Sequence, residues 1–438
     1  MKIITKMQNR IDVRKILTYL SLTVIMAFVY NISLKEHVFA SDIYIAITLL
    51  GCLGVLMLAH GKKIWQKIKM LSIKEGVLFG VCLLLLLIML IGNGDLAHGN
   101  FGKPFFSVYT VLLLLVYVYV EDCNKPLMQL ITVFTLEHVF FTWFFYFCPN
   151  LYKNHIIPLF PEFEYELIWQ FEHNQAAGFT MHYSTNGIYL AVGVIAFVCL
   201  LLSEKGKKKI PYAVLSAVTM ATLFLTGKRG HLLFVVAALF LVYFILNIKK
   251  IKKVLITSGI VLAAGVVLVL LVSLFIPDIL TPFTRFFTEA DITNGRMPLY
   301  RLALDEFLEH PIFGNGWGSY KYAFDASGVA GTRNNMDTHN VYLQLLSESG
   351  IVGFGVFVSI FIYMLATNIR LLHSDKREIS PYLIFALGIQ LFFLMYCVTG
   401  NPLYDVQISF IYVFACSVVL MESRKCWMGG AKLWKSKA

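Results

Sequence analysis

His339 and Asn340 stand just before a long apolar stretch of the sequence, and Gly350 and Gly353 follow within it. Histidine is the side chain best suited to accept a proton near neutral pH, so His339 is a candidate general base. Asn340 is a polar neighbour that could support it. A single histidine is more often structural than catalytic, so a structural role for His339 stays open on these residues alone.

Two positive side chains, Lys228 and Arg229, lie between Gly227 and Gly230 in a very tight connection of two predicted helices. Glycines let a backbone approach a ligand closely, and lysine and arginine side chains bind phosphate oxygens. The segment is therefore a candidate anion site. The alternative is that both side chains simply extend to the lipid headgroups.

Arg296 stands at the start of a predicted helix, and Arg301 lies about one turn further on. The first backbone N–H groups of a helix attract anions, so Arg296 is well placed to join such a site, with Arg301 in support. A solvated loop arginine is the alternative for Arg296.

Two further histidines stand near or within predicted membrane spans. His182 lies at the outer end of the predicted span 186–203 and is a second candidate for the site. His138 follows Glu137 inside the predicted span 126–148, where ionisable residues are costly and usually functional. A hydrogen bond between helices explains the Glu137–His138 pair equally well.

Several motifs that would indicate other chemistry are absent from the sequence. It contains no Walker motif, no GxGxxG or GxSxG segment, no HExxH and no CxxC, and the predicted outer loops hold no DxD-like carboxylate cluster. We therefore expect no metal and no cofactor. A metal-dependent transferase is disfavoured, and a nucleotide-driven pump still more so.

The composition indicates the setting in which these residues work. Of the 438 residues, 58% are hydrophobic and 14% are charged, whereas soluble domains have about 45–50% apolar and about 25% charged residues. The net charge of +11 in so apolar a chain indicates loops that face an anionic leaflet, and not a nucleic-acid surface. We therefore expect residues 1–438 to form a single all-α integral membrane domain.

About 20 largely apolar residues are needed for a helix to cross a bilayer, and twelve segments meet this requirement. Lysine and arginine concentrate in the N-terminal segment and in every second connection after it. Because positive residues favour the cytoplasmic side, we predict that both termini are cytoplasmic. The predicted spans are 15–33, 42–60, 74–92, 104–120, 126–148, 186–203, 210–226, 230–247, 254–276, 350–369, 380–398 and 404–422.

Two connections are much longer than the others, and both fall on the predicted outer side. They cover 149–185 and 277–349, and long loops in a compact bundle are usually functional. The second contains a predicted amphipathic helix at 297–310 that would lie along the membrane surface. Its expected apolar face consists of Tyr300, Ala303, Leu304, Phe307 and Leu308.

These residues resemble a known family. His339-Asn340, nine residues and then Gly350–Gly353 match the HNx9GxxG signature of the O-antigen ligase and O-antigen polymerase superfamily. The segment from Gly295 to Gly318 is similar to the pattern that precedes this signature, although Tyr300 stands where tryptophan is common. The segment Thr226–Gly230 is similar to a basic segment of the family.

The resemblance implies a type-C glycosyltransferase-like bundle that transfers a glycan from a polyprenyl diphosphate to an acceptor glycan, with inversion and without a metal. Positive side chains would bind the diphosphate, and a base would take the proton of the acceptor hydroxyl. Under this interpretation Arg229 and Arg296, helped by Lys228 and Arg301, hold the diphosphate. His339 is the base, with Asn340, His182 and Tyr300 in support.

The resemblance leaves the product open. A polymerase would join repeat units of a capsular polysaccharide, exopolysaccharide or O-antigen, and it is the interpretation we favour; a ligase would transfer a finished chain to lipid A core or a protein. Either would work at the outer face of the bacterial inner membrane among membrane lipids, with a flippase and a chain-length regulator as further partners. A flippase or transporter is the alternative of another class, although such proteins usually place substrate residues at midplane.

Overall fold

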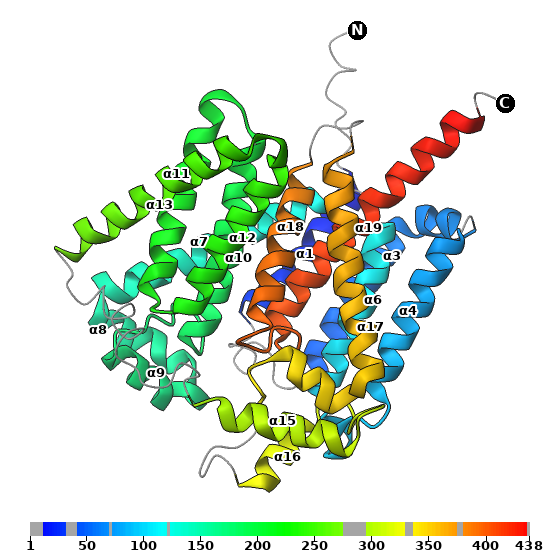
Figure 1. The fold of residues 1–438 in the computed structure, drawn as a ribbon, viewed down its shortest axis with the longest axis horizontal. Coiled ribbons are helices and arrows are strands. Elements are labelled where there is room, and N and C mark those ends of the chain that lie inside the picture. Colours follow the sequence, from blue (N-terminus) through cyan, green and yellow to red (C-terminus); the bar gives the residue numbers. More distant parts are fainter. Residues whose placement is uncertain are drawn as a thin grey trace.

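The structure is a computed structural model that describes residues 12–31, 42–69, 72–120, 123–274, 295–328, 336–374 and 380–435. Every regular element in these ranges is helical, which confirms the predicted all-α class (Figure 1). In chain order the helices are α1 (Val13–Tyr30), α3 (Asp42–Ile68), α4 (Ile73–Leu90), α5 (Gly94–Ala97), α6 (Gly102–Tyr119), α7 (Asn124–Phe147), α8 (Pro149–Leu151), α9 (Glu164–Glu172), α10 (Tyr183–Ser203), α11 (Lys209–Leu225), α12 (Arg229–Leu246), α13 (Ile251–Ser273), α15 (Met297–Glu309), α16 (Tyr320–Ser327), α17 (Val341–Leu372), α18 (Pro381–Tyr396) and α19 (Val406–Lys435).

Nine helices of the described residues are long and apolar enough to cross a membrane. They coincide with nine of the twelve predicted spans, so the chain is a multi-pass membrane protein. The other three predicted spans coincide with α11, α13 and α18. Of these, α18 is apolar but has only 16 residues. The count of twelve therefore stays a prediction.

The core of the bundle surrounds α10, α18 and α19. Most of the side chains of α10 and of the apolar part of α19 are buried, whereas α4 buries few of its own. Helix α18 packs against both α10 and α19, α12 packs on one flank of α18, and α6 packs on α19 at the other flank. The pair α18–α19 thus separates a side of the bundle that carries α12 from a side that carries α4 and α6 (Figure 1).

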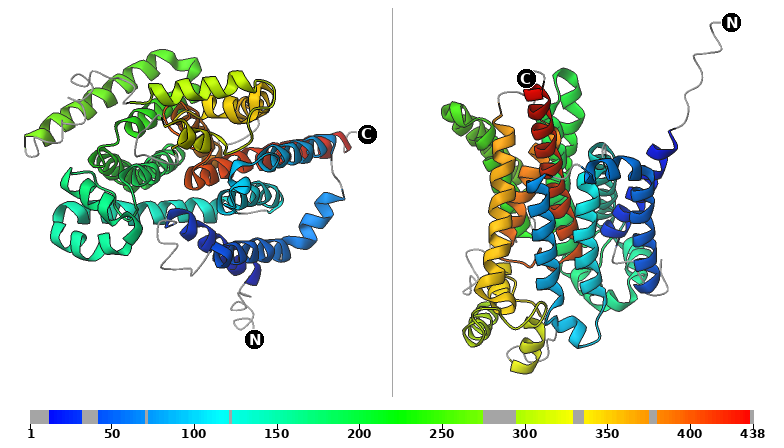
Figure 2. Two further views of the ribbon diagram at one scale, coloured as in Figure 1. Left: turned by 90° about the horizontal axis from the view of Figure 1, so that it is seen from below. Right: turned by 90° about the vertical axis from the view of Figure 1, so that its right-hand side faces the viewer.

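The two segments predicted as long outer loops are partly helical, and their helices lie at the same end of the bundle. Helices α8 and α9 come from 149–185, and α15 and α16 come from 277–349 (Figure 2). The C-terminal end of α19 lies at the opposite end. Residues 277–294 and 329–335 of the second predicted loop fall outside the described residues.

The amphipathic helix predicted at 297–310 is present as α15, and part of its surface packs within the protein. Leu299 and Ala303 are buried in a small cluster with two residues of α16, Tyr320 and Phe324. Leu304 is 43% exposed and Leu308 is 71% exposed. Helix α15 also packs on α17, and this contact sets which face is covered.

Helix α17 begins at Val341, earlier than the predicted start of its span at residue 350. Asn340 makes this early start possible, because its side chain accepts hydrogen bonds from the backbone N–H groups of Tyr342 and Leu343. The predicted boundary coincides instead with a kink at Gly350, whose φ of 60° and ψ of −170° are not helical. The predicted and observed boundaries thus mark two different features of one helix.

The kink at Gly350 joins α17 to the glycine-rich segment that follows α15. Across it, Gly316 N–H donates to Glu348 O at 2.8 Å, and Ile351 N–H donates to Pro311 O at 2.9 Å. A break in a helix leaves backbone donors and acceptors that need partners. The segment 311–316 supplies them, so the two glycine-containing motifs of the sequence form one structural unit.

Candidate functional site

Three of the predicted cations come together at the end of the bundle that carries α15. Lys228 precedes α12 in the turn from α11, and Arg229 begins α12. Gly227 closes this turn with a φ of 71°, a conformation that favours glycine. Burial, helped by the charges of Arg296 and Arg229 and opposed by that of Asp405, lowers the pKa of Lys228 to about 8. The charges of both arginines therefore act on Lys228.

Arg296 reaches this cluster from α15. Its Nη1 donates a hydrogen bond of 2.8 Å to the carbonyl oxygen of Thr399, in the connection between α18 and α19. The Nζ of Lys228 lies 5.1 Å from the ring centroid of Tyr183, where an aromatic face attracts a cation. The cluster therefore combines residues from the α11–α12 turn, α15 and the start of α10.

His182 lies beside these cations and is kept neutral. Its Nδ1 accepts a hydrogen bond of 3.0 Å from Ser184 N–H and so caps α10. Its Nε2 lies 3.4 Å from a carboxylate oxygen of Glu166 in α9. Burial, helped by the charges of Lys228 and His339, lowers the pKa of His182 to about 3. Both residues therefore act electrostatically on His182.

His339 occupies a turn immediately before α17, and its backbone is strained. It is one of two residues other than glycine with positive φ in the described ranges, at 54°. Such a conformation costs of order 1–3 kcal/mol and persists only where neighbouring residues enforce it. Here Asn340 N–H donates to Thr338 Oγ1 at 3.0 Å, and Val341 N–H donates to Cys397 O at 2.9 Å. The half-buried His339 is thus held beside the cation cluster.

Sequence reasoning missed two carboxyl groups of this region, those of Asp337 and Asp405. Burial, helped by the charge of Asp337 and opposed by those of Lys103 and Lys228, raises the pKa of Asp405 to about 7. One feature of the sequence could have indicated Asp405. The connection that follows the predicted span 380–398 falls on the same predicted side of the membrane as the two long loops.

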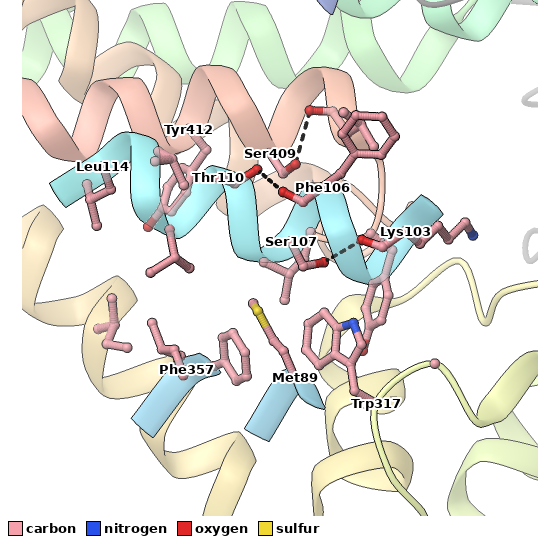
Figure 3. A pocket seen from close by; sticks show the side chains of 18 of the residues that line it. Met89, Lys103, Phe106, Ser107, Thr110, Leu114, Trp317, Phe357, Ser409 and Tyr412 are labelled. Atoms are coloured by element: carbon pink, nitrogen blue, oxygen red, sulfur yellow. Dashed lines mark hydrogen bonds between the residues drawn. The ribbon is translucent and has the colours of Figure 1, made fainter. Parts of the chain in front are cut away.

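An apolar groove lies between α4, α6, α17 and α19, on the side of the α18–α19 pair that is away from α12 (Figure 3). Figure 3 shows Lys103 and Trp317 at one end of the groove and Leu114 at the other. The part of α6 from Lys103 to Leu114 corresponds to about 16 Å at about 1.5 Å per residue. That length is roughly half of the 30 Å hydrocarbon core of a bilayer. The groove therefore matches a hydrocarbon chain that enters from one leaflet.

The mouth of the groove is polar and lies next to the turn of His339. It is lined by Asp337, two residues before His339, and by Lys103, Lys321 and Asp95. Lys321 forms an ion pair with Asp95, whereas Lys103 is exposed. An apolar chain in the groove would thus have its polar end close to His339 and Asp405.

The structure does not bring all the predicted site residues together. Arg301 is exposed on α15, and no contact among the described residues joins it to Lys228 or Arg296. Tyr300 packs against the cluster of Leu299 and Ala303, which is a structural position.

The pair Glu137–His138 lies within α7. The His138 ring is buried, and its centroid is 5.7 Å from that of Tyr30 and 4.5 Å from that of Tyr189. Its environment is that of an aromatic packing position.

A family match identifies the part of the chain that carries most of these residues. Residues 212–358 match the family model of the O-antigen ligases. This match confirms the resemblance to the O-antigen ligase and O-antigen polymerase superfamily. It covers about a third of the chain and includes Lys228, Arg229, Arg296 and His339, but not His182. No curated protein matched the chain.

The O-antigen ligase match and the apolar helices together indicate a multi-pass bacterial membrane protein with a function of the O-antigen ligase or polymerase type. Among the residues that the structure describes, no three histidine, cysteine, aspartate or glutamate side chains are grouped as a metal site would require. Independence from metals stays a prediction.

Proposed function

We propose that this protein transfers a glycan from a polyprenyl diphosphate to an acceptor sugar hydroxyl at the outer face of the bacterial inner membrane, as a polysaccharide polymerase. Two contacts support the proposal by bringing cations toward the turn of His339. Lys228 lies over the ring of Tyr183, next to His182. Arg296 bonds to Thr399 in the α18–α19 connection, to which the first residue of α17 also bonds. A diphosphate leaving group gains negative charge in the transition state, and fixed cations stabilise that charge. The side that carries α15 is the outer one in this proposal, and both termini are cytoplasmic.

In the proposed step, the oxygen of the acceptor hydroxyl attacks the anomeric carbon of the donor as His339 takes the hydroxyl proton. The bond between the anomeric carbon and the phosphate oxygen breaks, and its electron pair leaves with the polyprenyl diphosphate. Attack opposite the leaving group inverts the anomeric carbon. Lys228, Arg229 and Arg296 hold the diphosphate. Neutral His182 can approach the substrates without adding charge.

The apolar groove supports a lipid-linked donor. In a polyprenyl diphosphate glycan, the reacting carbon and the lipid chain are joined to the same diphosphate, so the chain must leave the site close to the reacting atom. Asp337, in the turn of His339, is among the residues that line the groove, and the groove runs along about 16 Å of α6. Its polar end holds Lys103, which adds positive charge next to the path of the diphosphate.

A ligase that transfers a finished glycan to lipid A core or a protein would use the same arrangement, because the cations and the base act on the donor and on a hydroxyl in either reaction. A flippase would move the glycan across the membrane without chemistry. The position of the cations at one end of the bundle, and not at its middle, favours an enzyme over a flippase.

The proposal is tested by His339→Ala and Arg229→Ala in the strain that carries the gene, with polymer length read on a gel and protein levels measured. Loss of a general base costs about 10²–10⁴-fold in rate, so long polymer should disappear in His339→Ala. It should also disappear in Arg229→Ala, because a cation that stabilises the leaving diphosphate is lost. Unchanged long polymer at normal protein level would refute the assignment of His339. Transfer of a whole chain to lipid A core, with polymer length unchanged, would identify a ligase.

A further inference from the structure

A buried hydrogen-bond network surrounds the turn of His339, and Gln344 is its centre. The side chain of Gln344 is 1% exposed, on the first turns of α17. Its Oε1 accepts from Thr338 N–H at 3.2 Å and from Asn401 Nδ2 at 2.9 Å. Its Nε2 donates to Asp337 Oδ1 at 3.0 Å and to Glu348 Oε1 at 3.0 Å. The Thr338 hydroxyl is also 3.2 Å from Oε1, so both donors and both lone pairs of the amide are used.

The partners of Gln344 are themselves fixed. Glu348 is 1% exposed, and its other carboxylate oxygen accepts from the Tyr404 hydroxyl at 2.7 Å. Its Oε1 also accepts from Tyr320 N–H at 3.3 Å, so the start of α16 is tied to the same group. Asn401 is 5% exposed in the connection between α18 and α19. The network therefore links α16, α17 and the α18–α19 connection around one amide.

This network acts on the residues immediately before His339. Gln344 binds the side chain of Asp337 and the backbone of Thr338, while Asn340 caps α17 on the other side of His339. The backbone of His339 is in the left-handed region, and it has to be held there by its neighbours. A buried amide with all its bonds made is an effective means of doing so, because breaking any one bond leaves a buried polar group without a partner.

We propose that Gln344 is a positioning residue that holds His339 in its strained, active orientation, and that Glu348 and Asn401 orient Gln344. This inference rests on the proposed function, because it assumes that His339 acts on the acceptor hydroxyl. Gln344 itself touches no substrate in this account. It acts by fixing where the imidazole lies, and a displacement of about 1 Å in a catalytic group can cost about 10²-fold in rate.

The test is a double-mutant cycle on single-turnover transfer by the purified full-length protein with a lipid-linked glycan donor. Gln344→Met keeps the length of the side chain and removes its amide. We expect Gln344→Met to lower the rate about 10²-fold at an unchanged KM for the donor. In the His339→Ala background, the same substitution should change the residual rate by less than about 2-fold, because there is no imidazole left to position.

Gln390 provides a matched control. It is a fully buried glutamine of α18 that accepts a hydrogen bond of 3.0 Å from Asn368 Nδ2, in the bundle core. Gln390→Met should lower thermal stability without changing the rate.

A second variant serves if Gln344→Met fails to fold. Asn401→Ala removes one hydrogen bond to Gln344, and the same double-mutant cycle can be measured with it. The expected loss of rate is smaller.

Two results would overturn the inference. One is a rate within about 2-fold of wild type for a folded Gln344→Met, and the other is an equal loss in the wild-type and His339→Ala backgrounds. Failure of the proposed function has a different signature, because His339→Ala alone would then leave the rate unchanged.

Discussion

Asp337 and His339 stand two residues apart in one turn and belong to different surroundings. The Asp337 carboxylate lines the mouth of the apolar groove, whereas His339 acts electrostatically on His182 beside Lys228. The turn therefore stands between the groove and the cation cluster. In the proposed reaction this is the place where the lipid chain, the diphosphate and the reacting carbon of the donor meet.

The two arginines of α15 should differ in their effect on transfer. Arg296→Ala removes a cation that belongs to the cluster and is bonded to Thr399 O, so the rate should fall about 10²–10³-fold. Arg301 is exposed outside the cluster, and Arg301→Ala should cost much less. Single-turnover rates of both variants measure this difference. Lys207→Ala, in the short helical turn before α11, is the control for loss of an exposed cation and should leave the rate unchanged. Equal losses for the two arginines would contradict the arrangement.

Binding of the donor should weaken as pH rises from about 6 to about 9. Asp405, with a pKa of about 7, gains a negative charge over this range, and Lys228, with a pKa of about 8, loses a positive one. Both changes make the site less attractive to a diphosphate, and we expect the donor KM to rise about tenfold. Lys228→Arg should remove the part of the rise near pH 8, because arginine stays charged. Asp405→Asn should remove the part near pH 7. A donor KM that is constant or falls with pH would count against this account.

Filling the groove should impair use of a long-chain donor. Ser409 lines the groove, and Ser409→Phe places a ring where the lipid chain would run (Figure 3). The donor KM should rise about tenfold or more for a polyprenyl donor, because a chain excluded from the groove loses about 0.8 kcal/mol for each buried CH₂ group. A donor with a very short chain should be much less affected. Ser359→Phe, at an exposed position of α17, is the matched control. An equal effect on long and short donors would argue against a lipid chain in the groove.

The kink of α17 should be sensitive to a single methyl group. At Gly350 a Cβ would overlap the carbonyl oxygen of Ile312, and the φ and ψ values there are accessible almost only to glycine. Gly350→Ala should therefore lower the free energy of unfolding by at least about 1–3 kcal/mol. A Cβ on Gly355 of the same helix meets nothing within 4 Å, so Gly355→Ala should be neutral or stabilise the protein by about 0.5–1 kcal/mol. Thermal unfolding in detergent compares the two. Equal stability of both variants would show that the kink tolerates a side chain.

Much of this arrangement follows from local sequence, and the remainder depends on contacts between distant segments. Apolar length predicts most of the helices, and charge at the outer ends of helices indicates Lys228, Arg229 and Arg296. Gln344, Asn401 and Glu348 carry no local signal, because a buried amide or carboxyl group in an apolar stretch acquires its role only from partners on other helices.

The early start of α17 shows the same limit. Hydropathy marks the span from residue 350, but Asn340 starts the helix at Val341, so the polar first turns lay outside the predicted span. The apolar face of α15 was predicted from periodicity alone, which gives no sign that Leu299 packs with Tyr320 and Phe324 of α16.

The most direct test of the central claim is transfer by purified protein in detergent, with a polyprenyl-diphosphate-linked glycan as donor and a glycan acceptor. We expect the wild-type protein to form product without a sealed membrane and in the presence of a chelator. Folded His339→Ala should lose about 10²–10⁴-fold in rate. Absence of product from folded wild-type protein in detergent, or an unchanged rate in His339→Ala, would contradict the account.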